Sequence, residues 1–291
     1  PKPPPGVGAR DNARRPTLVY AHGNASCRVE AISVLTLALS LGASVGARDC
    51  AGSGHSEGDY ISLGHYEQDD VAVVADYLSD ALGVTRVGVW GRSMGAATAV
   101  LYASSRAPDT ACVVADSSFA SLEELMYDLV AKVSSNIPST AVSIAVNHVT
   151  ESVKFRCGFD VHSVTPAHHA MACTTPCLIV HGANDDFILP KHGSEIAHRF
   201  GGAARVDCRL KTPPGGHNSK RPLAVYAEAE AFLRRYLMAD APPVIDLRAC
   251  RAPPGVEHIY MLPPWRHPQR TKRESVMDRA GGAAHAAPPV E

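Results

Sequence analysis

Short apolar runs alternate along most of this chain with segments long enough to form helices, and this alternation constrains the fold more than any other feature. The runs predicted as strands are 17–21 (TLVYA), 44–47 (SVGA), 86–90 (RVGVW), 111–116 (ACVVAD), 177–182 (CLIVHG) and 205–210 (RVDCRL). Strands that alternate with helices form parallel sheets covered by helices on both faces. The sequence therefore predicts an α/β protein with a mostly parallel sheet, whose functional residues follow the carboxyl ends of the strands.

Three segments have helical periodicity. Two of them repeat apolar residues at i, i+3 and i+7, namely Ile32, Leu35 and Leu39, and then Val71, Val74 and Leu78. Each of these patterns predicts one apolar stripe on a helix. A closing helix is predicted from residues spaced by three or four, which are Leu223, Tyr226, Ala229, Leu233 and Leu237.

The two ends of the chain lack this pattern. Residues 1–16 are rich in proline and are predicted to be a linker, and residues 242–291, rich in proline and arginine, are predicted to be a disordered tail. This division leaves residues 17–241 for one domain.

Charge and cysteine usage narrow the class of protein. The chain has 28 Lys plus Arg against 29 Asp plus Glu and a net charge of -1, so no basic excess favours nucleic acid or a membrane surface as a partner. The apolar stretch at 31–47 is too short to span a membrane. Scattered cysteines favour reduced thiols and a cytoplasmic location, although a start at Pro1 makes the lack of a targeting signal weak evidence.

The strand at 86–90 is followed by GRSMG (91–95) and then by a helical segment. G-x-S-x-G between a strand and a helix is the pattern of a sharp turn that lifts the serine above the sheet. Bulky side chains at Gly91 or Gly95 would collide with neighbouring backbone in such a turn. The pattern predicts Ser93 as a nucleophile, and the plainer interpretation is a glycine-rich turn with an incidental serine.

A serine hydroxyl needs a base to take its proton and a carboxylate to orient that base. Asp185 follows the strand at 177–182, and His217 follows the strand at 205–210. Both therefore belong at the sheet edge where Ser93 is expected. Asp185 is predicted to be the acid and His217 the base.

Other residues are alternative candidates for the acid and for the base. Asp186 adjoins Asp185, and Asp116 ends its own strand, where a turn-stabilising role is favoured over contact with a catalytic histidine. A solvent-exposed loop residue is the alternative for His217. The other histidines are predicted on loop or helix surfaces, among them His168, His169, His192 and His198.

An oxyanion formed at Ser93 needs N–H donors that are fixed in advance. The Met94 amide directly follows the nucleophile, and the Asn24 amide lies in HGNAS after the first strand. These two amides are the predicted oxyanion hole. His22 in the same segment is an alternative catalytic residue, but a role in shaping the oxyanion loop is favoured.

Taken in order, these motifs resemble the α/β-hydrolases, in particular the group with a serine-aminopeptidase-type (S33-type) domain that includes small esterases and protein depalmitoylases. The resemblance covers about 17–237 and rests on HGNAS, DCAGSGHSEGDY, GRSMG, VVADSSF, GFD, HGANDDFILP and GGHN. It implies the α/β-hydrolase fold. The roles that it implies are a nucleophile elbow at Gly91 and Gly95, Ser93 as nucleophile, Asp185 as acid, His217 as base, and the Asn24 and Met94 amides as oxyanion hole.

The sequence departs from this family in two ways. Ala51 replaces the arginine of the family's D-x-R-G-x-G turn, so the contacts of that arginine are lost. The family also has two strands before the one at 17–21, which residues 1–16 cannot supply. We therefore expect a fragment or a truncated product with one uncovered sheet edge.

Two alternative sites carry less weight. The glycine-rich GSGHSEG after the second strand raises a dinucleotide site, but it lacks an immediate helix and the expected acidic residue. A zinc site is the other alternative, formed by His168, His169, Cys173 and Cys177, although core packing of Cys177 is favoured.

The resemblance implies a serine hydrolase that needs no metal or organic cofactor and cleaves an ester, thioester or amide through an acyl-enzyme intermediate. An esterase is expected first, with a small-molecule, acylated or peptide substrate. A peptidase, a depalmitoylase or an inactive binding protein of the same fold are the alternatives. By the same resemblance, residues 117–176 form a small helical lid with Leu125, Met126 and Leu129 as pocket walls, although core packing explains these positions equally well.

Overall fold

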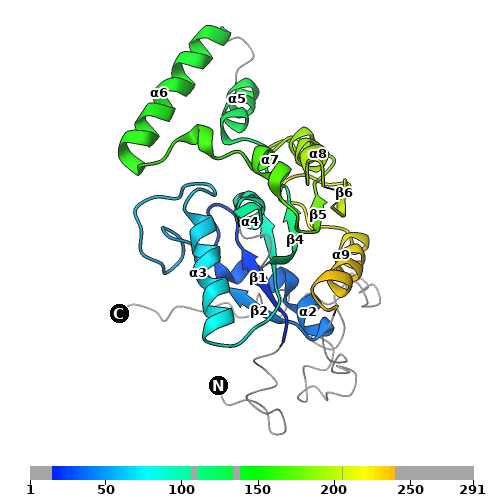
Figure 1. The fold of residues 1–291 in the computed structure, drawn as a ribbon. Helices are drawn as coiled ribbons and strands as arrows, with labels where there is room; N and C mark the ends of the chain where they lie inside the picture. The colour runs from blue at the N-terminus through cyan, green and yellow to red at the C-terminus, as the bar shows by residue number, and fades with distance from the viewer. Residues whose placement is uncertain (1–14, 106–109, 134–137, 205, 240–291) are drawn as a thin grey trace, which may run out of the picture.

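The computed structural model describes residues 15–105, 110–133, 138–204 and 206–239. These residues form a six-stranded sheet, and Figure 1 shows it between layers of helices. The predicted tail and all but residues 15 and 16 of the predicted linker lie outside this part of the chain. No helix among the described residues is both long and apolar enough to cross a membrane.

All six predicted strands are present and every neighbouring pair is parallel, in the order β2-β1-β3-β4-β5-β6. The strands are β1 (Thr17–Ala21), β2 (Ser44–Ala47), β3 (Val87–Arg92), β4 (Thr110–Asp116), β5 (Cys177–Val180) and β6 (Cys208–Lys211). The last strand begins at Cys208 rather than at residue 205. Within the described part of the chain, β2 pairs with β1 alone.

Helices cover both faces of the sheet (Figure 1). One face is covered by α3 (Glu67–Asp80), α4 (Met94–Ser105), α7 (Pro166–His169) and α8 (Pro190–Arg199), and the other by α2 (Ile32–Leu41) and α9 (Leu223–Tyr236). Successive residues of β1 alternate between the two cores: Val19 packs toward α3 and α4, whereas Leu18 and Tyr20 pack toward α2 and α9. This burial on both faces explains why the strands are continuously apolar.

The stripe predicted for α2 lies on the wrong face. Ile32, Leu35 and Leu39 are 65%, 36% and 47% exposed. The buried face of α2 instead carries Val34, Leu37, Ala38 and Leu41. Because seven of the ten residues of this helix are apolar, two stripes have helical spacing, and periodicity alone does not distinguish the buried one.

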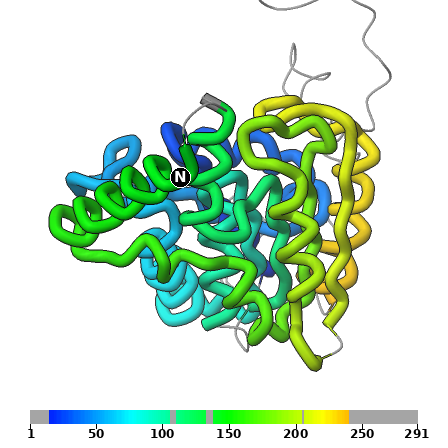
Figure 2. The backbone as a smooth tube through the Cα atoms, turned by 90° about the horizontal axis from the view of Figure 1, so that it is seen from above, coloured from blue at the N-terminus to red at the C-terminus, as the bar shows by residue number. Residues whose placement is uncertain are grey.

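The predicted lid segment (117–176) contains α5 (Leu122–Val133), α6 (Ser139–Cys157), two short 3-10 helices (Val161–Ser163 and Ala170–Ala172) and α7. In Figures 1 and 2, α6 extends away from the sheet, whereas α7 lies in the helical layer beside it. Leu125 is buried, and Met126 and Leu129 pack partly buried against the same cluster. Core packing at the base of α5 therefore accounts for these three residues.

Candidate active site

The strand-to-helix turn at Ser93 is made possible by two glycines. Ser93 has a φ of 53°, a left-handed conformation that is strained for a residue with a side chain. A Cβ atom at Gly91 would lie 1.9 Å from the Gly95 carbonyl oxygen, and one at Gly95 would lie 2.0 Å from the Ala21 carbonyl oxygen. The sharp turn predicted from G-x-S-x-G is therefore present.

The structure brings Ser93, His217 and Asp185 into one hydrogen-bonded chain. His217 Nε2 lies 3.0 Å from Ser93 Oγ, and His217 Nδ1 lies 2.8 Å from Asp185 Oδ2. An ionised carboxylate only accepts hydrogen bonds, so Nδ1 carries the proton. Neutral Nε2 is then free to accept the serine proton, which is the orientation that a general base requires.

Asp185 is buried but remains ionised. Burial raises the pKa of its carboxyl, and the hydrogen bonds from His217 and from the Ile188 and Phe187 amides outweigh that effect and lower it. The two amides donate to Oδ1 at 2.9 and 3.0 Å. The Asp185 carboxylate is therefore held in place from both oxygens.

The alternative candidates for the acid and the base make other contacts in the structure. Asp186 is 80% exposed and binds Lys132 at the end of α5. Asp116 forms a buried ion pair with Arg221 at 2.7 Å, in agreement with the structural role favoured for it. His22 is fully buried, lies 2.8 Å from the Gly23 carbonyl oxygen through Nδ1, and accepts the Cys50 amide on Nε2. Its ring therefore shapes the loop after β1 and has no nitrogen free for catalysis.

The loop after β1 (residues 22–27, the oxyanion loop) runs beside the nucleophile. A Cβ atom added at Gly23 would lie 3.7 Å from Ser93 Cβ. The Gly23 amide donates to Glu30 Oε2 at 2.8 Å, which removes it as an oxyanion donor. The Asn24 amide comes next in this loop, and Met94 is the first residue of α4, where helical amides have no intrahelical acceptor. Their role as the oxyanion hole stays a prediction.

Three residues near this site carry no sequence motif that identifies them. Arg92 donates to the His217 carbonyl oxygen at 2.9 Å, and Arg221 donates to the Gly216 carbonyl oxygen at 3.1 Å. The Phe187 ring lies 5.1 Å from the His217 ring, centroid to centroid, and is 46% exposed. The only available signal is position: Arg92 adjoins the predicted nucleophile, and Phe187 closely follows the predicted acid.

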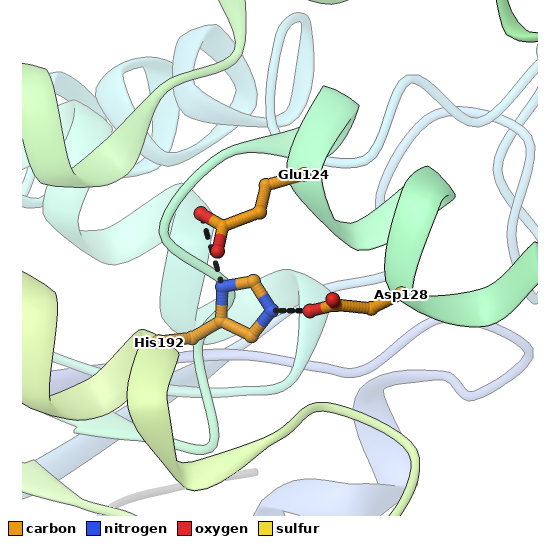
Figure 3. A group of neighbouring side chains, drawn as sticks. All are labelled: Glu124, Asp128 and His192. Carbon is orange, nitrogen blue, oxygen red and sulfur yellow. Dashed lines mark hydrogen bonds and ion pairs between the residues drawn. The ribbon is translucent and has the colours of Figure 1, made fainter. Parts of the chain in front are cut away.

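Figure 3 shows a second polar cluster, in which Glu124 and Asp128 of α5 face His192 of α8. The prediction that His192 is a surface residue is wrong, because its side chain is fully buried. Its Nδ1 accepts the Ala120 amide at 3.2 Å, so Nε2 carries the proton and donates to Asp128 at 3.0 Å. No sequence pattern indicates this contact, since the two residues lie 64 positions apart.

The ligand atoms of this cluster lie within 4.8 Å of one another, close enough to surround a metal ion. However, Lys191 Nζ lies 2.9 Å from Glu124 Oε1 and 2.8 Å from Asp128 Oδ1, so an ammonium group already neutralises both carboxylates. The protonated Nε2 of His192 offers no lone pair to a metal. The cluster therefore joins α5 to α8.

The alternative sites find no support in the described residues. None of the grouped metal-binding side chains there belongs to the zinc alternative at His168, His169, Cys173 and Cys177. Burial raises the pKa of the Cys177 thiol well above its usual range, as expected in a core. The glycine-rich turn after β2 wraps around Asp49, whose carboxylate accepts the Arg28 and His55 amides. The His55 amide of this turn is therefore already bonded to a carboxylate.

Known proteins share this fold. Residues 16–134 match the family model described as "alpha/beta hydrolase fold". Over 175 residues the chain is 31% identical to the uncharacterized protein YqkD of Bacillus subtilis (strain 168), a match that covers 59% of this chain and 56% of that relative. The matching part thus spans little more than half of the relative's length.

Three solved structures illustrate the likeness. The Pyrococcus furiosus esterase Pf2001 superposes with a TM-score of 0.60 at 23% identity, covering 78% of this chain and 85% of that chain. Est1E from Butyrivibrio proteoclasticus, with bound ferulic acid, has a TM-score of 0.58 at 18% identity, covering 78% and 91%. A proline iminopeptidase of Mycobacterium smegmatis has a TM-score of 0.54 at 18% identity, also covering 78% and 91%. Together with the parallel sheet and the turn at Ser93, these matches show that the chain has the α/β-hydrolase fold.

Proposed function

We propose that this protein is a serine hydrolase that cleaves a carboxylic ester, thioester or amide through an acyl-enzyme intermediate. The observation that carries the proposal is the continuous chain of hydrogen bonds from Ser93 Oγ through His217 to Asp185. These side chains come from three separate loops after β3, β5 and β6. Three such groups in series are what serine nucleophilic catalysis requires.

In the proposed mechanism, His217 Nε2 takes the Ser93 proton while Ser93 Oγ attacks the substrate carbonyl carbon. The carbonyl oxygen becomes an oxyanion, which the Asn24 and Met94 amides stabilise. His217 then protonates the leaving group, the acyl-enzyme forms, and a water molecule activated by His217 releases the acid and restores Ser93. The ionised Asp185 stabilises the imidazolium in both halves of the reaction.

Ester cleavage is our first choice of reaction. One of the similar structures is the Pyrococcus furiosus esterase Pf2001, and another, Est1E, has a bound aromatic acid, ferulic acid. The exposed Phe187 beside His217 offers an apolar surface next to the reacting atoms. A short-chain or aromatic acyl group fits such a surface better than a charged one.

A fluorophosphonate probe tests the nucleophile. We expect the native protein to label and the Ser93→Ala variant to lose labelling entirely, while Ser194→Ala, at an exposed serine of α8, labels as the native protein does. Asp185→Asn should reduce kcat by about 10⁴ because His217 loses the acceptor that fixes its tautomer. A folded native protein that never labels would overturn the proposal and leave a binding protein of the same fold.

Substrate class is tested separately, with p-nitrophenyl esters of increasing chain length beside aminoacyl p-nitroanilides. We expect kcat/KM to be highest for an ester and to fall for Phe187→Ala, with little change for Phe155→Ala, an exposed phenylalanine of α6. Higher kcat/KM on the amides would favour a peptidase instead.

A further inference from the structure

The loop between β6 and α9 (residues 212–222, the base loop) carries His217 but has no regular secondary structure to hold it. The loop is rich in proline and glycine, and Gly215 has a φ of 119°. A catalytic base on such a loop keeps its place only if other groups hold the backbone. Two guanidinium groups do so, on successive carbonyl oxygens.

Arg221 is the first of these two arginines, and it links the base loop to Asp116. Its Nη2 and Nε bind Asp116 at 2.7 and 3.0 Å, and its Nη1 donates to the Gly216 carbonyl oxygen at 3.1 Å. Both side chains of this ion pair are at least nine-tenths buried. The base loop is thereby fixed to the end of β4.

Arg92 holds the next carbonyl oxygen along the chain. Its Nη2 donates to the His217 carbonyl oxygen at 2.9 Å, across 125 residues of sequence. Its Nη1 lies 3.8 Å from Glu30 Oε1, and the other oxygen of Glu30 accepts the Gly23 amide at 2.8 Å. Arg92, the residue before the nucleophile, therefore connects the base loop through Glu30 to the oxyanion loop.

We propose that Arg92 is a positioning residue that, with Glu30, sets the base loop and the oxyanion loop at a fixed separation around Ser93. This inference rests on the proposed serine-hydrolase function. Arg92 touches neither the substrate nor the reacting atoms in this role. It acts through the backbone of His217 on one side and through Glu30 and the Gly23 amide on the other.

The expected effect is on the chemical step. A displacement of about 1 Å in a catalytic group lowers turnover about 100-fold, so losing the Arg92 contact should lower kcat roughly 10- to 100-fold with little change in KM. Lysine retains the charge but not the planar fork that reaches two acceptors, so Arg92→Lys should fall between the native protein and Arg92→Met. Glu30→Gln keeps an oxygen for the Gly23 amide but places a neutral NH2 group where a carboxylate oxygen faces Arg92.

The experiment measures the rate of fluorophosphonate labelling and the kcat and KM for p-nitrophenyl butyrate, per active site titrated with the same probe. The variants are Arg92→Met, Arg92→Lys, Glu30→Gln and the double variant, with Arg199→Met as control, since Arg199 pairs with Glu195 on the surface of α8. We expect Glu30→Gln to cost roughly 3-fold in kcat alone and nothing further in the Arg92→Met background, because both act through one contact.

The outcomes separate this inference from the function on which it rests. A native protein that does not label removes the proposed function and the inference with it. A native protein that labels, together with an Arg92→Met variant of native kcat, overturns the inference alone. If Arg92→Met fails to fold, the kcat values of Glu30→Gln and Arg92→Lys test the inference instead. A native kcat in both of these variants overturns the inference.

Discussion

Ser93 occupies a conformation that only its surroundings make possible. Its positive φ is held by the Ser93 amide, which donates to the Asp116 carbonyl oxygen at 2.8 Å, and by the close approach of α4 to the loop after β1. The glycine before the turn and the one after it allow this approach. The strain thus lies at the residue that performs the proposed chemistry.

A methyl group at Gly95 tests this arrangement. Because its Cβ would lie 2.0 Å from the Ala21 carbonyl oxygen, backbone must move, and we expect Gly95→Ala to lower the free energy of unfolding by roughly 1–3 kcal/mol and to abolish fluorophosphonate labelling. Gly46→Ala is the control, since its Cβ would meet only side-chain carbons at 3.6 Å or more. Urea unfolding and probe labelling measure both effects, and native labelling by Gly95→Ala would contradict the prediction.

The residues that sequence reasoning found and missed differ in what identifies them. Ser93, Asp185 and His217 each follow a strand of a parallel sheet, so the topology alone predicts that they meet. Arg92, Arg221 and Glu30 act through contacts between distant segments, and a charged side chain in a sequence carries no record of its partner. The burial of Arg221 cannot be predicted without knowing that Asp116 forms an ion pair with it.

At the scale of elements, α2 shows where periodicity fails. Leu37 is fully buried against the sheet, whereas Leu39, which belongs to the stripe predicted as buried, is 47% exposed. We expect Leu37→Ala to cost about 2–5 kcal/mol in the free energy of unfolding, because it leaves a cavity, and Leu39→Ala to cost about 0.5 kcal/mol or less. Urea unfolding of both variants checks this, and equal losses would mean that the face of α2 is assigned wrongly.

Helix α5 is attached to the loop and helix that follow the predicted acid. Lys132 binds Asp186 at 2.9 Å, and Lys191 binds Glu124 and Asp128 at 2.9 and 2.8 Å. The base of the lid segment is thus fixed beside Asp185 by charges at both ends of one helix. Partly exposed pairs of this kind contribute roughly 0.2–1 kcal/mol each.

Charge reversal tests this attachment. Lys191→Glu places a third negative charge beside Glu124 and Asp128, so we expect faster amide hydrogen exchange across 122–133. The double variant Lys191→Glu with Glu124→Lys should recover part of the protection. Lys154→Glu, at an exposed lysine of α6, is the control and should leave α5 unchanged. Unchanged exchange in Lys191→Glu would show that apolar contacts alone hold α5.

For the whole molecule, the fold class and all six strands were predictable because short apolar strands separated by helices have few other arrangements. The strand order and the position of α6, which extends away from the sheet, were not predictable, since both depend on which distant surfaces of the chain come into contact. The same is true of the burial of His192, whose partner Asp128 lies on another helix. Local pattern therefore predicts the layers, and contacts between distant residues decide how the lid segment and the supporting arginines are placed.

Acid should destabilise the folded protein partly by protonating Asp207. The side chain of Asp207 contacts both the last strand and the last helix. Its carboxylate accepts hydrogen bonds from Arg209 of β6 and from the Tyr236 hydroxyl of α9. The bond from Arg209, followed by that from Tyr236, lowers the pKa of Asp207 from 3.8 to about 2. Because the folded-state pKa is the lower one, this stabilisation is present above about pH 4 and is lost as the pH falls toward 2.

We therefore expect the free energy of unfolding of the native protein to fall more steeply between about pH 4 and pH 2 than that of Asp207→Asn, which has no carboxyl to protonate there. The difference should be about 1 kcal/mol, since solvent screens a side chain that is 30% exposed. Urea unfolding at a series of pH values measures it, with Asp59→Asn, at an exposed aspartate, as the control. Parallel curves for the native protein and Asp207→Asn would show that the contact between β6 and α9 does not depend on this charge.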